Sequence, residues 1–216
     1  MKHPSRPPPL SLVMDRSRSI AFFEAQFRKQ AAAQDFGLNP FEARVLPLLH
    51  GDVLELGCGL GNLAMAAARQ GARVHALDAS PAAIESLGVR ARASGLEITA
   101  QWAELSDYAP DRDYDCVVAI GLFMFFPPEI ARGQLARALG AVRPGGIAAI
   151  NVLIEGTTYL DMFDAERGYH LFGQDELPRA VAGWQRLDDR VEQFEAPGDT
   201  VKRFRTVIAR RPAARA

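Results

Sequence analysis

Three glycines at alternate positions mark the stretch of the sequence best suited to binding a ligand. Gly57, Gly59 and Gly61 follow the acidic Glu55 and the apolar run 53–56, and strong helix formers come directly after them. We therefore expect a buried strand, a glycine turn and a helix in succession. Glycine is needed where the backbone takes a positive φ or comes close to a ligand, and open α/β sheets bind nucleotides at such turns.

A second acid indicates the class of ligand. Asp78 ends the next expected strand and follows Gly57 by roughly the 20 residues that separate a glycine turn from a ribose-binding acid. Its carboxylate can accept hydrogen bonds from both hydroxyls of a ribose. The ligand predicted from these two features carries a ribose.

The spacing of the glycines distinguishes between ribose-bearing ligands. A dinucleotide-binding turn has the pattern Gly-x-Gly-x-x-Gly, and Asn62 stands at its third glycine position. The sequence has no Gly-x-x-x-x-Gly-Lys-Ser/Thr motif, which would indicate a site for a triphosphate. The acidic Glu55 argues against a phosphate and favours a cationic or amine-bearing ligand.

The stretch 55–61 resembles the first motif of class I S-adenosylmethionine-dependent methyltransferases, acid-x-Gly-x-Gly-x-Gly, and Asp78 matches their second motif. The resemblance implies S-adenosyl-L-methionine as cofactor and S-adenosyl-L-homocysteine as product. It also implies an α/β fold, a Rossmann-like doubly wound seven-stranded sheet that is mostly parallel with an antiparallel C-terminal strand.

The same resemblance suggests roles for individual residues. Glu55 would attract the ammonium group of the cofactor, and Asp78 would bind its ribose. Glu104 would accept a hydrogen bond from the adenine amino group, although a surface acid is the alternative at this position. The expected cofactor-binding residues are Glu55, Gly57, Cys58, Gly59, Gly61, Asn62, Asp78, Ala79, Glu104, Leu105, Ile120 and Gly121.

An aromatic segment, residues 120–128, follows the expected strand 114–120. In the resembled fold this segment lines the methionine end of the cofactor and the acceptor pocket, and its large side chains would exclude water from a reacting sulfonium. The catalytic residues stay unassigned. Candidates for the acceptor pocket are Phe125, Tyr159, His170 and Arg205. The respective alternatives are a core ring, a loop aromatic, a solvated histidine and a surface cation.

A closer resemblance, to the tellurite-resistance methyltransferases, extends from about residue 52 to the end of the chain. It is carried by the stretches 114–126, 143–146, 172–184 and 203–211. It implies a chalcogen oxyanion or a thiol as acceptor. That subfamily has a histidine in the loop between its last two strands, and the loop 196–199 has none.

Strands and helices are expected to alternate along the chain, which is typical of a parallel sheet. We expect a flexible N-terminal arm over 1–18, a helical lid over 19–50 and a methyltransferase domain over 51–216. The lid begins with a helix over 19–34, with Ser19 as N-cap and an apolar face of Ile20, Phe23 and Phe27, and continues with a helix from Pro40 to about Leu49. Further expectations are a turn at 143–146 and a C-terminal hairpin of strands 185–194 and 200–210.

The composition excludes several classes of protein. A net charge of −1 over 216 residues does not favour binding to nucleic acid or to a membrane surface, and the apolar runs are too short to span a bilayer. Two cysteines and four histidines without paired spacing argue against a disulfide framework and a metal site. The sequence therefore predicts a cytoplasmic protein, and the resemblance to the methyltransferases implies a small-molecule acceptor. It does not indicate an oligomeric state.

Two other functions remain open from the sequence. A non-catalytic regulatory protein could keep the S-adenosylmethionine pocket, and enzymatic activity would distinguish it from a methyltransferase. A dinucleotide-dependent oxidoreductase is less favoured, because it would need a third glycine where Asn62 stands and a second catalytic region.

Overall fold

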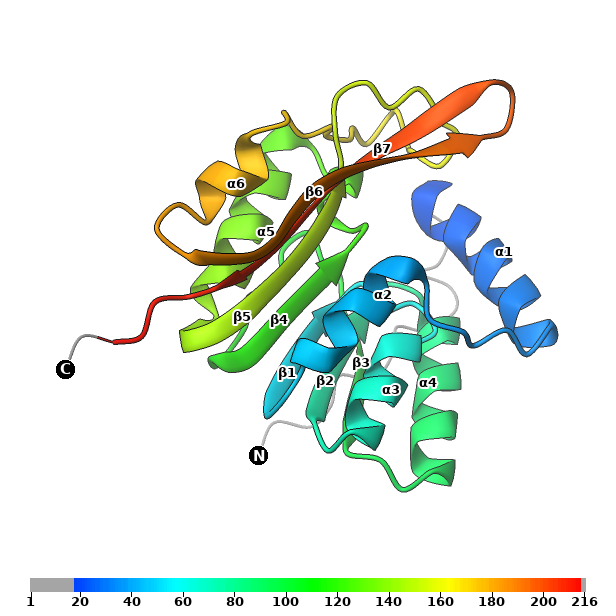
Figure 1. Cartoon of the computed structure of the whole chain (residues 1–216). Coiled ribbons are helices and arrows are strands. Elements are labelled where there is room, and N and C mark those ends of the chain that lie inside the picture. Colours follow the sequence, from blue (N-terminus) through cyan, green and yellow to red (C-terminus); the bar gives the residue numbers. More distant parts are fainter. Residues whose placement is uncertain (1–17, 215–216) are drawn as a thin grey trace.

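A seven-stranded sheet forms the framework of the computed structural model, which describes residues 18–214 (Figure 1). The strand order is β3-β2-β1-β4-β5-β7-β6. The first five strands, β1 to β5, are all parallel to one another. Strand β7 lies between β5 and β6 and is antiparallel to both. This confirms the expected fold class. The strands are β1 Asp52–Leu56, β2 Arg73–Asp78, β3 Ile98–Trp102, β4 Tyr114–Ile120, β5 Val142–Leu153, β6 Gln185–Ala196 and β7 Thr200–Arg210.

Helices cover both faces of the sheet. Helices α2, α3 and α4 pack on one face, and α5 and α6 pack on the other (Figure 1). Each face of the sheet has its own hydrophobic core, and successive residues of the central strands point to opposite cores. Val118 packs in the core under α3 and α4, and Val117 packs in the core under α5. The helices are α1 Arg18–Ala32, α2 Pro40–Val45, α3 Asn62–Arg69, α4 Pro81–Ala93, α5 Pro128–Gly140 and α6 Glu176–Ala180, with short 3₁₀ turns η2 Leu46–Leu48 and η3 Phe123–Phe125.

The start of α2 follows its sequence signal, but its end does not. The Asn39 side chain accepts hydrogen bonds from the N–H groups of Phe41 and Glu42, both at 2.9 Å, and Glu42 accepts one from the Asn39 N–H at 2.7 Å. The expected helix to Leu49 is too long. It gives way to the 3₁₀ turn η2, which contains Pro47, a residue without the N–H that an α-helix needs.

Helix α1 also differs in detail from the expectation. It already includes Arg18, so Ser19 lies within the helix and is not its N-cap. The buried residues of α1 are Ser19 and Glu24, whereas Phe23 and Phe27 are half-buried. Most of the expected N-terminal arm lies outside the described residues.

Residues 143–146 were expected to form a turn, and this expectation is wrong. They belong to β5, whose register with β4 shifts between Tyr114 and Cys116. The Gly145 N–H donates to the Arg211 carbonyl at 3.0 Å, and the Arg211 N–H donates to the Gly146 carbonyl at 2.8 Å. Pairing with a segment distant in sequence therefore keeps these residues in the strand despite the local turn signal, with an irregularity at Gly145, whose φ is +80°.

An ionic network joins β1, β4 and β5 at their amino-terminal ends. Asp52 donates its N–H to the Asp115 carboxylate at 2.7 Å, and Arg143 contacts the carboxylates of Asp52 at 3.2 Å and Asp115 at 2.8 Å. The Arg73 Nε donates to Asp52 at 2.8 Å. Hydrogen bonding by Arg73 and Arg143 holds the pKa of Asp52 below its usual range. This network lies at the edge of the sheet opposite to the glycine turn.

Candidate cofactor and acceptor site

The glycine turn after β1 lies at the carboxyl edge of the parallel strands, and its backbone requires glycine. Gly57, Gly59 and Gly61 have φ angles of +71°, +52° and +68°, a region that other residues rarely adopt. A β-carbon on Gly59 would lie 2.9 Å from the ring of Phe27, and one on Gly61 would lie 2.5 Å from Leu87. The turn is therefore shaped for close approach by other groups.

Asp78 lies next to this turn. Its two carboxylate oxygens accept hydrogen bonds from the N–H of Gly59 at 2.7 Å and the N–H of Ser80 at 2.8 Å. Burial raises the pKa of Asp78, an effect that these two N–H donors oppose. Each oxygen has a second lone pair, so the carboxylate can still accept from the hydroxyls of a ribose.

Glu55 is buried in β1 and only 4% exposed. Its Oε2 has no hydrogen-bond partner among the described residues. Burial raises the pKa of Glu55 well above its usual value, and the nearby charges of Glu42 and Asp78 raise it further. A hydrogen bond from the Ala64 backbone opposes this shift, but Oε2 stays without a partner. A buried carboxyl oxygen without a partner is costly, so a cationic ligand at this point would offset the cost.

The expected adenine end lies after β2 and β3. The Trp102 Nε1 donates to the Ala79 carbonyl at 3.0 Å, which fixes the turn that follows Asp78. Glu104 is exposed and accepts from the Ser106 hydroxyl at 3.1 Å, while Leu105 is buried. The end of β4 adds Ile120 and Gly121, and the Gly121 N–H donates to the Asn151 carbonyl at 2.8 Å.

Glu24 of α1 is a site residue that sequence reasoning missed. It is 6% exposed, and its Oε1 accepts a hydrogen bond from the Ser80 hydroxyl at 3.2 Å. Because the Ser80 N–H is bonded to Asp78, and Asp78 to Gly59, a continuous chain of hydrogen bonds joins α1 to the glycine turn. An acid among the phenylalanines of the α1 face was the only signal in the sequence.

Aromatic side chains from separate segments meet beside the end of β4. The Phe125 ring centroid lies 5.2 Å from that of Phe23 in α1 and 5.1 Å from that of Phe163. Phe163 in turn stacks on Tyr169 with a centroid distance of 4.4 Å. We call Phe23, Phe125, Phe163 and Tyr169 the aromatic wall. Phe163 is buried, whereas Phe23, Phe125 and Tyr169 are half-buried and leave part of their apolar rings exposed.

Two of the other acceptor-pocket candidates are already bonded to acids. The His170 Nε2 lies 3.0 Å from Glu176, which Arg132 also contacts at 3.2 Å. Burial raises the pKa of Glu176, but hydrogen bonds from Arg132 and His170 outweigh this and lower it to about 2. Arg205 forms an ion pair with Asp189.

Tyr159, the remaining candidate, lies beside β7. The Lys202 Nζ is 4.6 Å from the centroid of its ring. Of the four candidates, Phe125 therefore lies in the aromatic wall and Tyr159 lies against the β6–β7 hairpin. His170 is paired with Glu176, and Arg205 is paired with Asp189.

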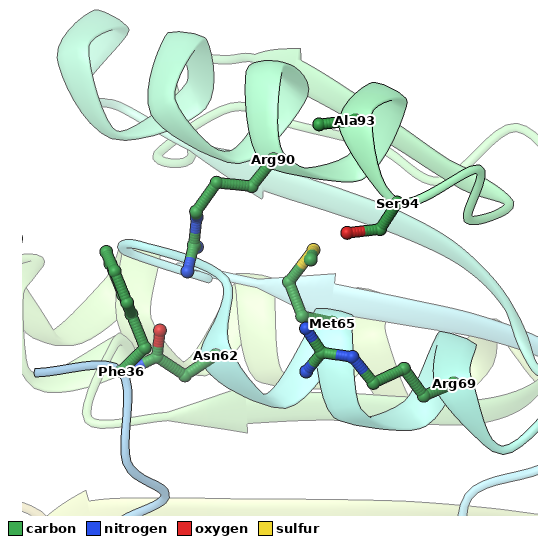
Figure 2. Close-up of a pocket in the computed structure, with 7 residues that line it drawn as sticks. All are labelled: Phe36, Asn62, Met65, Arg69, Arg90, Ala93 and Ser94. Atoms are coloured by element: carbon green, nitrogen blue, oxygen red, sulfur yellow. The ribbon is translucent and has the colours of Figure 1, made fainter. Parts of the chain in front are cut away.

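A hollow of about 220 Å³ lies between α3 and α4, next to the predicted cofactor position (Figure 2). Arg90 enters it from α4, donates to the Leu60 carbonyl in the glycine turn, and stacks 4.2 Å from the ring of Phe36. Neither Glu55 nor Asp78 lines the hollow, so its residues support the turn from behind. They are Phe36, Asn62, Met65, Arg69, Arg90, Ala93 and Ser94.

Comparison with known proteins agrees with this geometry. Residues 53–146 match the family model described as a methyltransferase domain. Over these residues the chain is similar to a methyltransferase domain. The match includes the glycine turn, Asp78, and strands β2 to β4, so the half of the sheet with the expected cofactor-binding residues lies within it. S-adenosylmethionine is the cofactor of this class of domain, and the unpartnered Glu55 oxygen and the glycine turn beside Asp78 fit its ammonium and ribose groups.

Curated relatives of the methyltransferase domain have several names. Hemagglutinin 1 of Eikenella corrodens is 28% identical over 74% of this chain and 54% of its own length. The 2-heptyl-1-hydroxyquinolin-4(1H)-one methyltransferase of Mycobacteroides abscessus is 27% identical over 77% of both chains. A ubiquinone biosynthesis O-methyltransferase of Rhizobium etli is 31% identical over 78% of this chain and 65% of its own length. The chain thus spans about half the length of the first of these relatives.

Solved structures share the fold. TehB from Haemophilus influenzae superposes with a TM-score of 0.71 at 18% identity, over 84% of this chain and 65% of that one. The N-methyltransferase NodS from Bradyrhizobium japonicum, solved with S-adenosyl-L-homocysteine, has a TM-score of 0.65 at 16% identity, over 90% and 99% of the two chains. At sequence identities this low, the similarity to TehB and NodS shows a shared fold and nothing about the acceptor.

The described part of the chain has neither a membrane-spanning helix nor a cluster of metal ligands. Within residues 18–214, no helix has the length and apolar character needed to cross a membrane. In the same part of the chain, no three His, Cys, Asp or Glu side chains form a group that could hold a metal ion. Both cysteines, Cys58 and Cys116, are buried and free.

Proposed function

We propose that the protein transfers a methyl group from S-adenosylmethionine to a small-molecule acceptor. The observation that supports this most strongly is the buried Glu55, whose Oε2 has no partner among the described residues, beside a glycine turn bonded to Asp78. Glu55 attracts the ammonium group of the cofactor, and Asp78 accepts from its ribose. Glu104 and Leu105 bind the adenine, and Ile120 and Gly121 border the methionine end.

The bound cofactor supplies a methyl group on a positively charged sulfur, which is already reactive. An acceptor hydroxyl or thiol would react in its deprotonated form, after losing its proton to water. Its lone pair would form the new bond to the methyl carbon, and the sulfur would keep the electron pair of the carbon–sulfur bond that breaks. The residues of this chain need only align the acceptor and exclude water. The aromatic wall suits both tasks, because its rings are apolar and come from three separate segments.

The acceptor that the site favours is a hydroxyl group on an aromatic ring. The aromatic wall offers ring faces for stacking, and relatives named for a hydroxyquinolinone and for ubiquinone biosynthesis are consistent with such an acceptor. A chalcogen oxyanion or a thiol is the second candidate, supported by the likeness to TehB. The hairpin loop at Pro197–Asp199 does not favour this second candidate, because it contains no histidine.

We further propose that residues 19–50 act as a lid. Phe27 packs against Gly59, and Glu24 reaches the turn through Ser80, so α1 covers the place where the cofactor would bind. The linker after α1 adds a hydrogen bond from the Asn62 amide to the Gly37 carbonyl at 3.3 Å. On this proposal, the cofactor enters when α1 moves away and is enclosed when it returns.

Calorimetric titration with S-adenosylmethionine and S-adenosylhomocysteine tests the proposed function. We expect both to bind, and we expect Asp78→Ala to weaken binding by at least about tenfold, whereas Asp111→Ala, an exposed acid, leaves it unchanged. Preference for a nicotinamide dinucleotide would instead indicate an oxidoreductase. Binding without methyl transfer to phenols, thiols or chalcogen oxyanions would favour a regulatory protein.

A further inference from the structure

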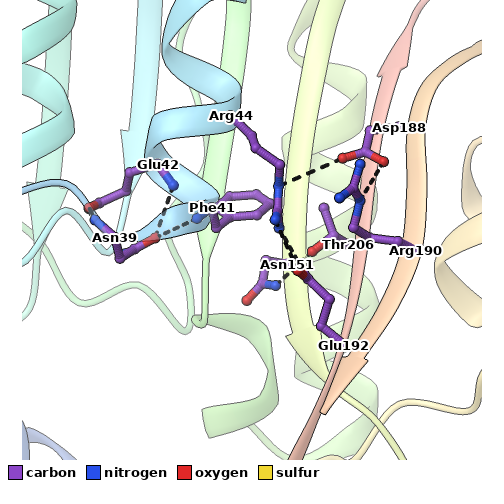
Figure 3. Close-up of polar contacts among 9 residues, drawn as sticks. All are labelled: Asn39, Phe41, Glu42, Arg44, Asn151, Asp188, Arg190, Glu192 and Thr206. Carbon is purple, nitrogen blue, oxygen red and sulfur yellow. Dashed lines mark hydrogen bonds and ion pairs between the residues drawn. The ribbon is translucent and has the colours of Figure 1, made fainter. Parts of the chain in front are cut away.

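Lys202, Phe204 and Thr206 lie on one face of β7, because alternate residues of a strand point to the same side. Asn151 of β5 shares this face, since its amide donates to the Thr206 hydroxyl at 2.9 Å. Arg44 of α2 reaches the same face through Glu192, the partner of Phe204 in β6 (Figure 3). The face therefore looks toward α2.

The arginines on this face are paired with acids, and Lys202 is not. Arg44 donates to Glu192 at 2.9 Å and lies 3.9 Å from Asp188, which also accepts from Arg190 at 2.8 Å (Figure 3). Among the described residues, no acid forms an ion pair with Lys202. Its Nζ lies over the ring of Tyr159 at 4.6 Å, and the side chain is half-buried. Burial lowers the pKa of Lys202.

Lys202 also lies beyond the carboxyl ends of β4 and β5, where the acceptor would bind. Ile120, the last residue of β4, is level with Asn151 and Thr206 in the register of the sheet. Lys202 precedes Thr206 by four residues on β7, which runs antiparallel to β5. Lys202 therefore lies about 13 Å farther toward the carboxyl ends of β4 and β5 than Ile120 does. An acceptor that extends from the end of β4 along β7 would reach it.

We infer that Lys202, with Tyr159, binds an anionic group at the far end of an extended aromatic acceptor. This inference rests on the proposed methyl transfer and specifies its substrate class. A carboxylate would supply the partner that Lys202 lacks, and the rings of Tyr159 and Phe204 would pack against the apolar body of the acceptor. Phe194, 46% exposed and 5.9 Å from the Phe204 ring, extends this apolar surface.

The test uses 4-hydroxycinnamate and its neutral amide as a matched pair of probes. Each is titrated into the full chain in the presence of S-adenosylhomocysteine. We expect the carboxylate to bind about tenfold more tightly than the amide. Lys202→Met should abolish this preference, and Lys202→Arg should keep it. Lys29→Met is the control, because it removes the same charge from an exposed position on α1.

The outcomes separate this inference from the proposed function. Equal binding of the two probes, failure of both to bind, or a preference that survives in Lys202→Met would overturn the role of Lys202. Binding of S-adenosylhomocysteine is measured first in each variant. If the wild-type chain binds it and shows no preference for the carboxylate, the inference fails and the methyltransferase proposal stands. If the wild-type chain does not bind it, the proposed function itself fails.

Discussion

Glu55 combines features that ordinary core residues avoid. It is an acid 4% exposed, one of its oxygens has no partner among the described residues, and its pKa is raised well above the usual value by burial. In the pH range between its ordinary and its raised pKa, the folded chain holds a proton on Glu55 that the unfolded chain has lost. Stability therefore falls as the pH rises through this range, and the residue lowers stability in favour of ligand binding.

This protonation gives a prediction for cofactor binding. An ammonium group placed at Glu55 favours the ionised carboxylate, so S-adenosylmethionine should displace a proton when the pH is below the raised pKa. Affinity should then increase as the pH rises toward that pKa. Calorimetry in buffers of different ionisation enthalpy measures the released proton. Glu55→Gln should release less and bind about tenfold more weakly. Equal proton release by both proteins would exclude Glu55 as the group that ionises.

Local patterns identified some site residues, and tertiary contacts were needed for others. Glu55 and Asp78 stand out in the sequence because each follows a short apolar run at a recognisable distance from the glycines. Glu24 and Lys202 do not. Glu24 matters because its carboxylate accepts from Ser80, which is bonded to Asp78. Lys202 matters because no acid within residues 18–214 forms an ion pair with it. Such contacts join residues far apart in the chain, so composition and spacing cannot indicate them.

At the scale of elements, helix α1 is held against the glycine turn by the ring of Phe27 and the carboxylate of Glu24. Phe27 contacts Gly59, and Glu24 reaches Asp78 through Ser80. The sequence predicted a helix here and an apolar face, but it could not predict that an acid is among the residues buried. It also misjudged residues 143–146, where the partner that decides the conformation is Arg211. Elements whose conformation depends on neighbours in sequence were therefore the easier ones to predict.

The contacts of α1 predict that Glu24→Gln weakens binding of S-adenosylmethionine. A neutral amide is a weaker acceptor for the Ser80 hydroxyl, so Asp78 would be positioned less firmly and Kd should rise about threefold to tenfold. Calorimetry measures the change. Glu85→Gln is the matched control, because it removes an exposed acid from α4. If the two variants bind the cofactor equally well, α1 does not act through Glu24.

Over the whole molecule, the two edges of the sheet have different tasks. The carboxyl edge holds the glycine turn, Asp78 and the aromatic wall, whereas the amino edge holds the network of Asp52, Asp115 and Arg143. The first edge contains a buried acid with one oxygen that has no partner among the described residues, and the second contains acids that arginines pair. The strands between the two edges are buried, so they connect the edges rigidly.

This division predicts that Asp52→Asn lowers stability without affecting the cofactor site. The arginines around Asp52 are partly exposed, so we expect a loss of about 1 kcal/mol, or about 2–4 °C in Tm, at neutral pH. The folded pKa of Asp52 is lowered, so its contribution is fully present above its ordinary pKa of 3.8 and is lost as the pH falls below that value.

The variant and the wild-type chain should therefore differ in Tm at pH 7 and converge below pH 3.8, provided that the chain still unfolds reversibly there. Asp107→Asn, at an exposed position, controls for the charge change and should leave Tm unchanged. Affinity for S-adenosylmethionine should be the same in all three proteins, because Asp52 lies at the opposite edge of the sheet from Glu55 and Asp78. A change in that affinity on replacing Asp52 would show that the amino edge also shapes the glycine turn, and the division of tasks between the edges would not hold.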